Sequence, residues 1–250
     1  MKDIILCDGT NIEEIAQKAR KNGFGIEIQA FHKPENCKNK SQINLHKKHS
    51  KWLSPIGFHA PFADLCPWSS DPMIRDVAKN RFDLGYSAAS KLGVSHIVHH
   101  IWRVPGAGIP QRRAERCVNF WNEFLKWKSE DIHFHIENQF DINPEVLSLV
   151  IDGIKKNNVN VCLDIGHAHC HSDISVLDWI KILKDKIGYV HIHDNNWEAD
   201  EHVWIGKWTI PMVEVLTALN TYAPDAIWAL ECKNEYIDES IARLEEHNFL

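Results

Sequence analysis

Residues 161–173, VCLDIGHAHCHSD, join the end of an apolar run to a cluster of side chains that are able to bind a metal ion. The run begins at 159 and is short and rich in β-branched residues, which is typical of a buried strand. Asp164 stands where this strand ends, and five more potential ligands follow within nine residues: His167, His169, Cys170, His171 and Asp173. A carboxylate buried there needs a partner, because burying it bare costs several kcal/mol.

Similar apolar runs recur along the whole chain, at 4–7, 25–31, 56–60, 95–101, 132–137, 188–194 and 226–231. Amphipathic segments lie between them, and several carry helix-boundary signals. The segment 11–23 ends in glycine, 71–93 opens with Asp71 and Pro72 and also ends in glycine, and 143–158 opens with Asn143 and Pro144. Eight alternating β and α units in 250 residues predict a (β/α)8 TIM barrel, with residues 1–250 forming a single domain.

Two points of this fold prediction have alternatives. A doubly wound open sheet has a similar pattern of elements, but no glycine-rich phosphate-binding sequence follows the first strand. The second helix is the weakest element, because residues 35–52, ENCKNKSQINLHKKHSKW, are so polar that most of this segment is compatible with a loop.

Composition and charge bound the cellular setting. The net charge of −6 gives no electrostatic reason to bind nucleic acid or an acidic membrane. The N-terminal apolar run is too short for a signal peptide, and no later run approaches the length of a membrane span. Seven cysteines without a CxxC motif favour free thiols in a reducing compartment. We therefore expect a cytoplasmic protein without a membrane segment.

Polar residues gather at the ends of the predicted strands. In a TIM barrel the C-terminal ends of all strands meet at one mouth, where the chemistry takes place. A single histidine or carboxylate there is most simply structural, but six of the eight strands repeat the pattern, which favours one shared divalent-metal site. The residues concerned are His59, His99, His100, Glu137, Asp164, His191, His193, Asp194 and Glu231.

Four short motifs resemble a known family. They are IEN with Glu137, CLDIGHA with Asp164 and His167, HIHD with His191, and ALE with Glu231. Together, and in this order, they are similar to the xylose isomerase-like (AP endonuclease family 2) TIM barrels, which include sugar and sugar-phosphate isomerases and epimerases and endonuclease IV. The resemblance covers nearly the whole chain. It implies a metal held by Glu137, Asp164, His191 and Glu231, and the family pattern His-x-x-acid selects His191 over His193.

The resemblance extends to further positions that bind either additional metal or substrate. These are His59, His100 (with His99 as the alternative), His167, Asp200 and His202. With the first four ligands they match the nine ligands of the three-zinc endonuclease, although sugar-acting relatives also keep several of them. In the epimerases the position of His167 contacts substrate. For His169, Cys170, His171 and Asp173 we favour an ordinary role in the following loop and helix cap.

The four-ligand set is rich in oxygen and has one imidazole, which suits Mn²⁺ or Co²⁺, with Zn²⁺ or Mg²⁺ as alternatives. Such an ion acidifies the C–H group beside a carbonyl that it binds. The resemblance implies that Glu137 and Glu231 then act as acid and base. The sequence thus predicts a metal-dependent isomerase or epimerase of carbohydrate metabolism, acting on a sugar, sugar phosphate or related polyol.

Tryptophans and arginines bear on the substrate. Trp102 and Trp208 follow predicted strands, so their rings are candidates for stacking on a sugar. Arg103 and the group Arg112, Arg113 and Arg116 are candidates for binding a phosphate, although solvent exposure is the simpler interpretation of that group.

The alternative function is an endonuclease IV-like zinc phosphodiesterase acting on abasic DNA. The nine matching ligands favour it. The acidic net charge argues against it, and so does Trp208, which stands where the family often has Gly-x-Gly and narrows the mouth. We therefore expect a small carbohydrate as the partner and no nucleic acid, and a homo-oligomer stays an open option.

Overall fold

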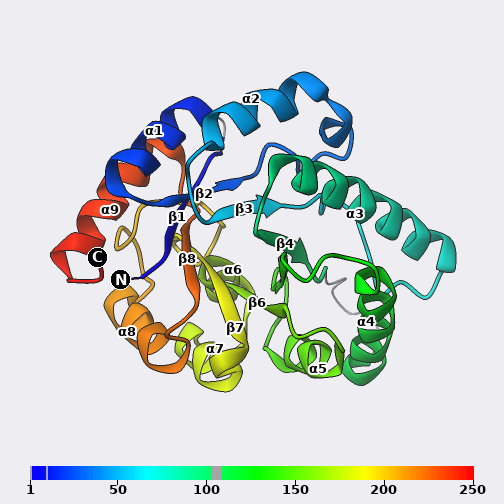
Figure 1. Cartoon of the computed structure of the whole chain (residues 1–250). Coiled ribbons are helices and arrows are strands. Elements are labelled where there is room, and N and C mark those ends of the chain that lie inside the picture. The colour runs from blue at the N-terminus through cyan, green and yellow to red at the C-terminus, as the bar shows by residue number, and fades with distance from the viewer. Residues whose placement is uncertain (1, 10, 103–108) are drawn as a thin grey trace.

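Eight parallel strands close into a barrel in which each strand pairs with the next and β8 pairs with β1 (Figure 1). This computed structural model describes residues 2–9, 11–102 and 109–250. The strands are β1 (Ile4–Cys7), β2 (Gly25–Ile28), β3 (Ile56–His59), β4 (His96–His100), β5 (His133–Glu137), β6 (Val159–Asp164), β7 (Ile187–Ile192) and β8 (Ile227–Leu230). The predicted single-domain TIM barrel is confirmed, and the closing β1–β8 pair rules out an open sheet.

Apart from the short α6 (Ile165–His171), the helices of the described residues form a ring around the barrel (Figure 1). The helices of the ring are α1 (Ile12–Asn22), α2 (Lys40–Ser50), α3 (Pro72–Leu92), α4 (Pro110–Leu125), α5 (Glu145–Gly153), α7 (Val176–Leu183), α8 (Met212–Tyr222) and α9 (Ile237–Glu246). The described part of the chain also contains the 3₁₀ turns η1 (Asn36–Lys38), η2 (Lys184–Lys186) and η3 (Asn234–Tyr236). No helix in the described ranges is long and apolar enough to cross a membrane.

The boundary residues of α3 act as the sequence pattern predicts, whereas α5 begins after Pro144, at Glu145, and ends at Gly153. The Asp71 carboxylate accepts a hydrogen bond from the backbone N–H of Met73 at 2.8 Å, and Pro72 begins α3. This helix ends at Gly93, whose φ of 75° lies in the left-handed region that glycine adopts without strain. The two ends of α3 are therefore fixed by different physical causes. A side-chain hydrogen bond caps the N-terminus, and a glycine that adopts a left-handed conformation ends the helix.

The polar segment after β2 forms a helix, which corrects the alternative that most of it is a loop. Asn39 caps α2 by accepting a hydrogen bond from the N–H of Gln42 at 3.1 Å. Ile43, His46 and Ser50 are buried, at helical spacing, against the rest of the fold. A short helix that rests on so few buried side chains leaves most of its residues in water, which explains why its sequence is polar.

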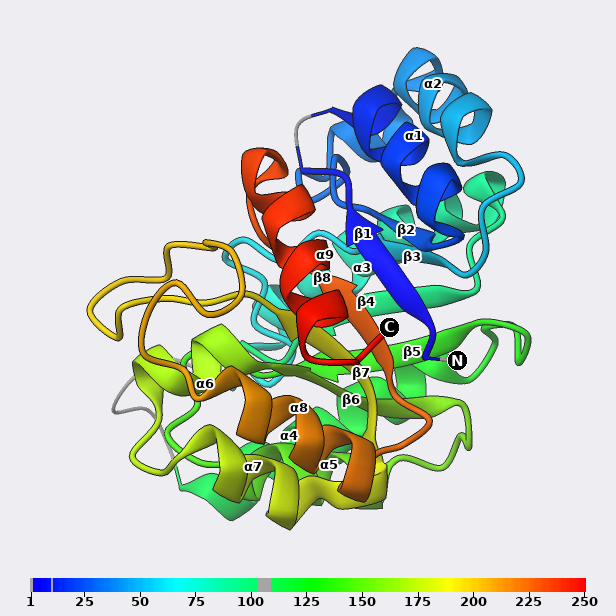
Figure 2. The same ribbon diagram turned by 90° about the vertical axis from the view of Figure 1, so that its left-hand side faces the viewer.

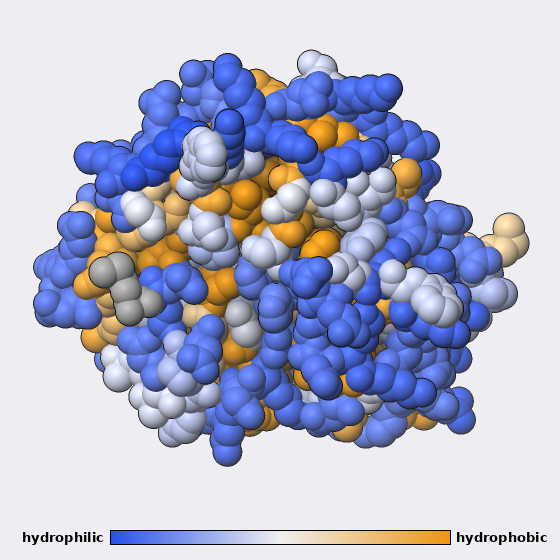
Figure 3. Space-filling view, viewed as in Figure 1, coloured by the Kyte–Doolittle hydropathy of each residue, from blue (hydrophilic) through white to orange (hydrophobic). Residues whose placement is uncertain are grey.

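The packing forms two layers with different compositions. The larger core lies between the sheet and the helices, and Figure 3 shows hydrophilic residues over the outline of the molecule, with hydrophobic ones in the recesses between them. A small second core fills the inside of the barrel: Ile5, Cys7, Val98, Cys162, Tyr189, Ile227 and Ala229. Unlike a fully apolar barrel core, this interior also holds the buried carboxylate of Glu27.

The C-terminal ends of the strands carry the longer loops. The loop 193–211 between β7 and α8 projects from this end of the barrel in Figure 2, and an isolated bridge between Asp194 and Val203 braces it. Asp194 also accepts hydrogen bonds from the N–H groups of Asn195, Trp208 and Ile210. This strand-end residue therefore holds the loop together instead of facing the mouth.

Candidate metal centre

Four strands bring the predicted ligands Glu137, Asp164, His191 and Glu231 to one point. His191 Nδ1 lies 3.4 Å from Glu137 Oε1, 3.3 Å from Glu231 Oε2 and 3.8 Å from Asp164 Oδ2. The side chains are almost entirely buried, and the most exposed, Glu231, has 12% of its side-chain surface exposed. Three carboxylate oxygens thus face one ring nitrogen in a place that water barely reaches.

The hydrogen bonds of His191 decide whether its Nδ1 carries a hydrogen or a free lone pair. Its Nε2 lies 3.1 Å from Glu27 Oε2, which also accepts a hydrogen bond from the Tyr189 hydroxyl. Burial favours the neutral form of Glu27, but the charge of the neighbouring His191 holds the pKa of Glu27 at about 2. A carboxylate only accepts hydrogen bonds, so Nε2 carries the hydrogen. In the neutral ring Nδ1 is therefore a lone pair aimed at anionic oxygens.

A second group of donors lies beside the first at Glu137. His59 Nδ1 donates to the Ala60 carbonyl at 3.0 Å, which leaves Nε2 as the free nitrogen of the neutral ring. His59 Nε2 and His100 Nε2 lie 3.3 and 3.1 Å from Glu137 Oε2 and 3.2 Å from each other. His100 is thus the histidine that faces the site, because the ring of His99 packs on the opposite side of the sheet against Phe82 and Trp121.

A third group is built around Asp200. His167 Nδ1 donates to the Asn138 carbonyl at 2.9 Å and His202 Nδ1 to the Glu231 carbonyl at 2.7 Å. The Nε2 atoms of both rings then point at Asp200 Oδ2, at 3.3 and 2.9 Å. In each ring a backbone carbonyl holds one nitrogen and orients the other, the arrangement by which proteins orient metal-binding histidines.

The arrangement of the donor atoms in the three groups is better explained by bound divalent cations than by hydrogen bonding among the groups alone. Among the described residues, three atoms of these groups, His191 Nδ1, Glu137 Oε2 and Glu231 Oε2, are buried without a hydrogen-bond partner. Buried polar atoms are rarely left so, and each free atom here is a good ligand for a divalent metal. Nitrogen lone pairs facing carboxylate oxygens repel them unless a proton or a cation lies between.

The charges of the site depend on their neighbours. Burial favours the neutral form of Asp200, but hydrogen bonds with His167 and His202 hold its pKa well below the usual range. Burial raises the pKa of Glu231. Burial alone would lower the pKa of His202. The hydrogen bond with Asp200 and the charge of Glu231 outweigh burial and raise the pKa of His202 to about 9. At neutral pH without a cation, protons on the histidines therefore balance the carboxylates.

The predicted tryptophans and arginines are not among the residues of these three groups. Trp102 is half-buried and packs edge-on against Phe140, whereas Trp208 borders a separate cavity beside α8 and α9. Arg113 is buried and paired with Asp141 at 2.6 Å, so it is neither solvated nor free for a phosphate. Arg103 lies outside the described residues.

The stretch after Asp164 divides into two parts. His167 faces the site, and Asp164 caps α6 by accepting the N–H of His167 at 2.7 Å. His169, Cys170 and His171 belong to α6 itself, a correction to the expected loop, and His169 bonds Thr209 at 2.9 Å.

Two residues that touch the predicted ligands, Glu27 and Gln29, were not predicted from the sequence, and His193 was considered there only as the alternative to His191. His193 Nε2 lies 3.2 Å from Asp164 Oδ1, and its ring stacks on His202. Glu27 contacts His191, and Gln29 contacts Glu231. A charged residue in the middle of the apolar run GIEIQAF was the available signal for Glu27, because a carboxylate inside a barrel needs a specific partner.

Comparison with known proteins agrees with this architecture. Residues 8–247 match the family model described as the xylose isomerase-like TIM barrel. The chain belongs to the xylose isomerase-like TIM barrel family. Members of this family differ in activity, so the family sets the fold and leaves the reaction to be argued from the site.

Individual relatives span nearly the same length. The chain is 28% identical over 246 residues to the uncharacterised protein MJ1311 of Methanocaldococcus jannaschii, covering 90% of this chain and 79% of that protein. Among solved structures, the TTHB071 protein from Thermus thermophilus soaked with ZnCl₂ has a TM-score of 0.80 and 22% identity, covering 98% of this chain and 97% of that one. A D-tagatose 3-epimerase-like protein has a TM-score of 0.78 and 24% identity, covering 99% and 97%.

We predict that metal affinity rises with pH. Because the pKa of His202 is raised to about 9, its ring is protonated at neutral pH, and a cation that it binds must displace that proton. The apparent affinity should increase by up to about tenfold per pH unit for each proton displaced. Calorimetric titration of Mn²⁺ or Zn²⁺ at several pH values, in buffers of different ionisation enthalpy, counts the protons released. Affinity that is independent of pH, with no proton release, contradicts the assignment.

Proposed function

We propose that this protein is a divalent-metal-dependent isomerase or epimerase of a sugar, sugar phosphate or related polyol. The observation that carries the proposal is the convergence of Glu137, Asp164, His191 and Glu231, with unpartnered donor atoms facing one point. The likeness to a D-tagatose 3-epimerase-like protein supports it, and the zinc-soaked relative supports a divalent metal. The donor set accepts Mn²⁺, Co²⁺, Mg²⁺ or Zn²⁺.

The cavity above the centre has the size of a small-molecule site. Its volume is about 340 Å³, within the usual range for pockets that enclose small ligands. It is lined by Gln29, His32, His59, Phe62, His100, Glu137, Gln139, His167, Asp200, His202 and Glu231. Polar donors and acceptors on every side suit a ligand with many hydroxyl groups.

Two of the lining carboxylates are placed to move a proton. Glu137 comes from β5 and Glu231 from the end of β8, three strands apart around the barrel. When bound, the cation would acidify the C–H group beside a substrate carbonyl. Glu231, whose pKa burial raises, is then suited to take or return that proton on one face, with Glu137 serving the other.

Replacing either carboxylate should suppress proton exchange between substrate and solvent. We predict that Glu137→Gln and Glu231→Gln slow deuterium incorporation from D₂O into a reactive ketose by about 10²- to 10⁴-fold, the usual contribution of general acid–base catalysis. NMR over a panel of ketoses and their phosphates provides the measurement, with metal content determined for each variant.

Asp141→Asn is the matched control, because Asp141 is also buried but pairs with Arg113 outside the cavity. It should exchange at the wild-type rate. If metal-loaded wild-type protein exchanges no hydrogen into any substrate tried, the isomerase proposal is wrong.

A metal-dependent phosphodiesterase acting on abasic DNA is the second candidate. The observation that favours it is the three adjacent donor groups, centred on Glu137 Oε2, His191 Nδ1 and Asp200 Oδ2. A single-metal isomerase does not require His59 and His100 to point at Glu137. Several metal ions in one site are typical of enzymes that cleave phosphate esters.

Metal stoichiometry separates the two candidates. The isomerase predicts one tightly bound equivalent that survives His100→Leu, whereas the phosphodiesterase predicts three, with one lost in that variant. His99→Leu is the matched control, because the ring of His99 packs among aromatic side chains away from the site. Mass spectrometry of metal in dialysed protein measures the content. Cleavage of an abasic oligonucleotide by the loaded protein would decide for the second candidate.

A further inference from the structure

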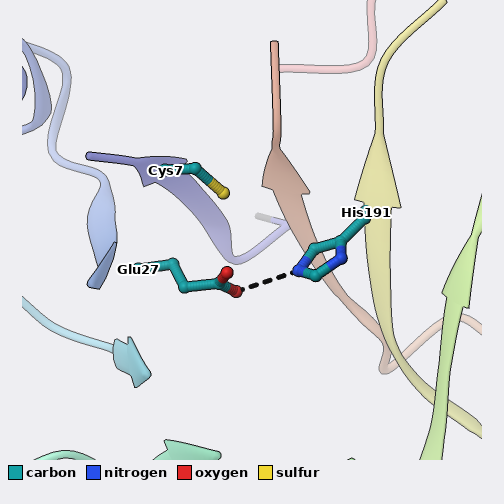
Figure 4. Close-up of side chains that lie close together, drawn as sticks. All are labelled: Cys7, Glu27 and His191. Carbon is teal, nitrogen blue, oxygen red and sulfur yellow. Dashed lines mark hydrogen bonds and ion pairs between the residues drawn. The ribbon is translucent and has the colours of Figure 1, made fainter. Parts of the chain in front are cut away.

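Glu27 of β2 is a buried carboxylate whose two oxygens are both engaged. Its exposed fraction is 0%. Oε2 accepts a hydrogen bond from the Tyr189 hydroxyl at 2.6 Å and lies 3.1 Å from His191 Nε2. Figure 4 shows the Glu27 side chain reaching across the barrel interior to the His191 ring, with Cys7 nearby. Oε1 accepts a hydrogen bond from Gln29 Nε2 at 3.1 Å.

Gln29 connects Glu27 to a second ligand of the centre. Two residues further along the chain, it presents its side chain on the same face as Glu27. Its amide nitrogen lies 3.1 Å from Glu27 Oε1 and 2.6 Å from Glu231 Oε1. Carboxylates only accept hydrogen bonds and an amide NH₂ has two hydrogens, so one hydrogen goes to each.

These bonds decide which atoms of the ligands stay free. The bond to Glu27 uses His191 Nε2 and leaves Nδ1, while the bond to Gln29 uses Glu231 Oε1 and leaves Oε2. The two remaining atoms lie 3.3 Å apart, the separation expected of two donors on one cation. Both are buried without a hydrogen-bond partner among the residues described.

We propose that Glu27 and Gln29 are positioning residues of the metal centre: Glu27 sets the tautomer and orientation of His191, and Gln29 orients Glu231. The inference rests on the proposed metal centre but not on which reaction takes place there. Neither residue is among the ligands that the family resemblance implies. Their role follows from the two hydrogen-bond chains that run from β2 to β7 and β8.

The barrel interior is shaped to admit this support. A side chain at position 57 of β3 would place its Cβ 2.7 Å from the Tyr189 hydroxyl oxygen and 3.2 Å from Glu27 Cγ. Glycine is therefore the residue that leaves room for the Tyr189–Glu27 pair. Tyr189 in turn donates to the carboxylate from the side opposite the mouth, so the polar pair is enclosed instead of open to water.

The test is the metal affinity of the purified full-length protein, measured by titration with Co²⁺ and Mn²⁺. We expect Glu27→Gln to weaken binding by about 10- to 100-fold, the usual effect of losing an outer partner of a metal ligand. Gln29→Met should weaken it by about tenfold. Both should alter the visible spectrum of bound Co²⁺, which a general loss of stability does not change. Tyr189→Phe, which removes one donor to Glu27, should have a smaller effect.

Asp141→Asn serves as the control for removing a buried carboxylate. It should lower thermal stability without moving the dissociation constant or the Co²⁺ spectrum. If Glu27→Gln fails to fold, Gln29→Met decides, because Gln29 is only half-buried at the mouth. Wild-type affinities and spectra in Gln29→Met, and in Glu27→Gln where it folds, overturn the positioning role and leave the metal centre intact. Wild-type protein that binds no divalent metal overturns the proposed function, and this inference with it.

Discussion

The structure depends on how the negative charges of carboxylates that are buried close together are balanced. Glu27, Glu137 and Asp164 are at most 1% exposed and the side chain of Glu231 is 12% exposed. All four lie near the strand ends of a barrel whose hydrogen-bonded closure prevents them from turning away. Burying such charges without compensation costs several kcal/mol each. Histidines from strand ends and loops surround them, and a divalent cation is the partner that this donor set accepts best.

Most of the fold was predictable because local and tertiary signals coincide. The strands are short apolar runs, and the caps at Asn11 and Asp71 and the glycines at 23 and 93 bound helices where the pattern placed them. The helix over 40–50 was the difficult element to predict. Only Ile43, His46 and Ser50 are buried, and the rest of its sequence is polar because it faces water. Tertiary packing, which the linear pattern does not display, makes that segment helical.

The site was predictable to the extent that strand ends reveal it. Asp164, Glu137 and Glu231 end apolar runs, and a barrel must bring them together. The choice of His100 over His99 required the structure. Consecutive residues of a strand point to opposite faces of the sheet, and the apolar run does not show which of the two histidines points into the barrel. Gln29 was missed because its role is defined by a contact with Glu231, at the end of β8, that no spacing in the chain encodes. The contact of His193 with Asp164, at the end of the neighbouring strand β6, is likewise visible only in the structure.

The most direct measurement is the anomalous diffraction signal of a crystal grown with Mn²⁺ or Zn²⁺. The account predicts a peak within bonding distance of Glu137, Asp164, Glu231 and His191, bound through Nδ1 of the histidine while Nε2 keeps its bond to Glu27. A peak at a different place, or the four side chains turned apart in well-ordered density without one, would contradict it.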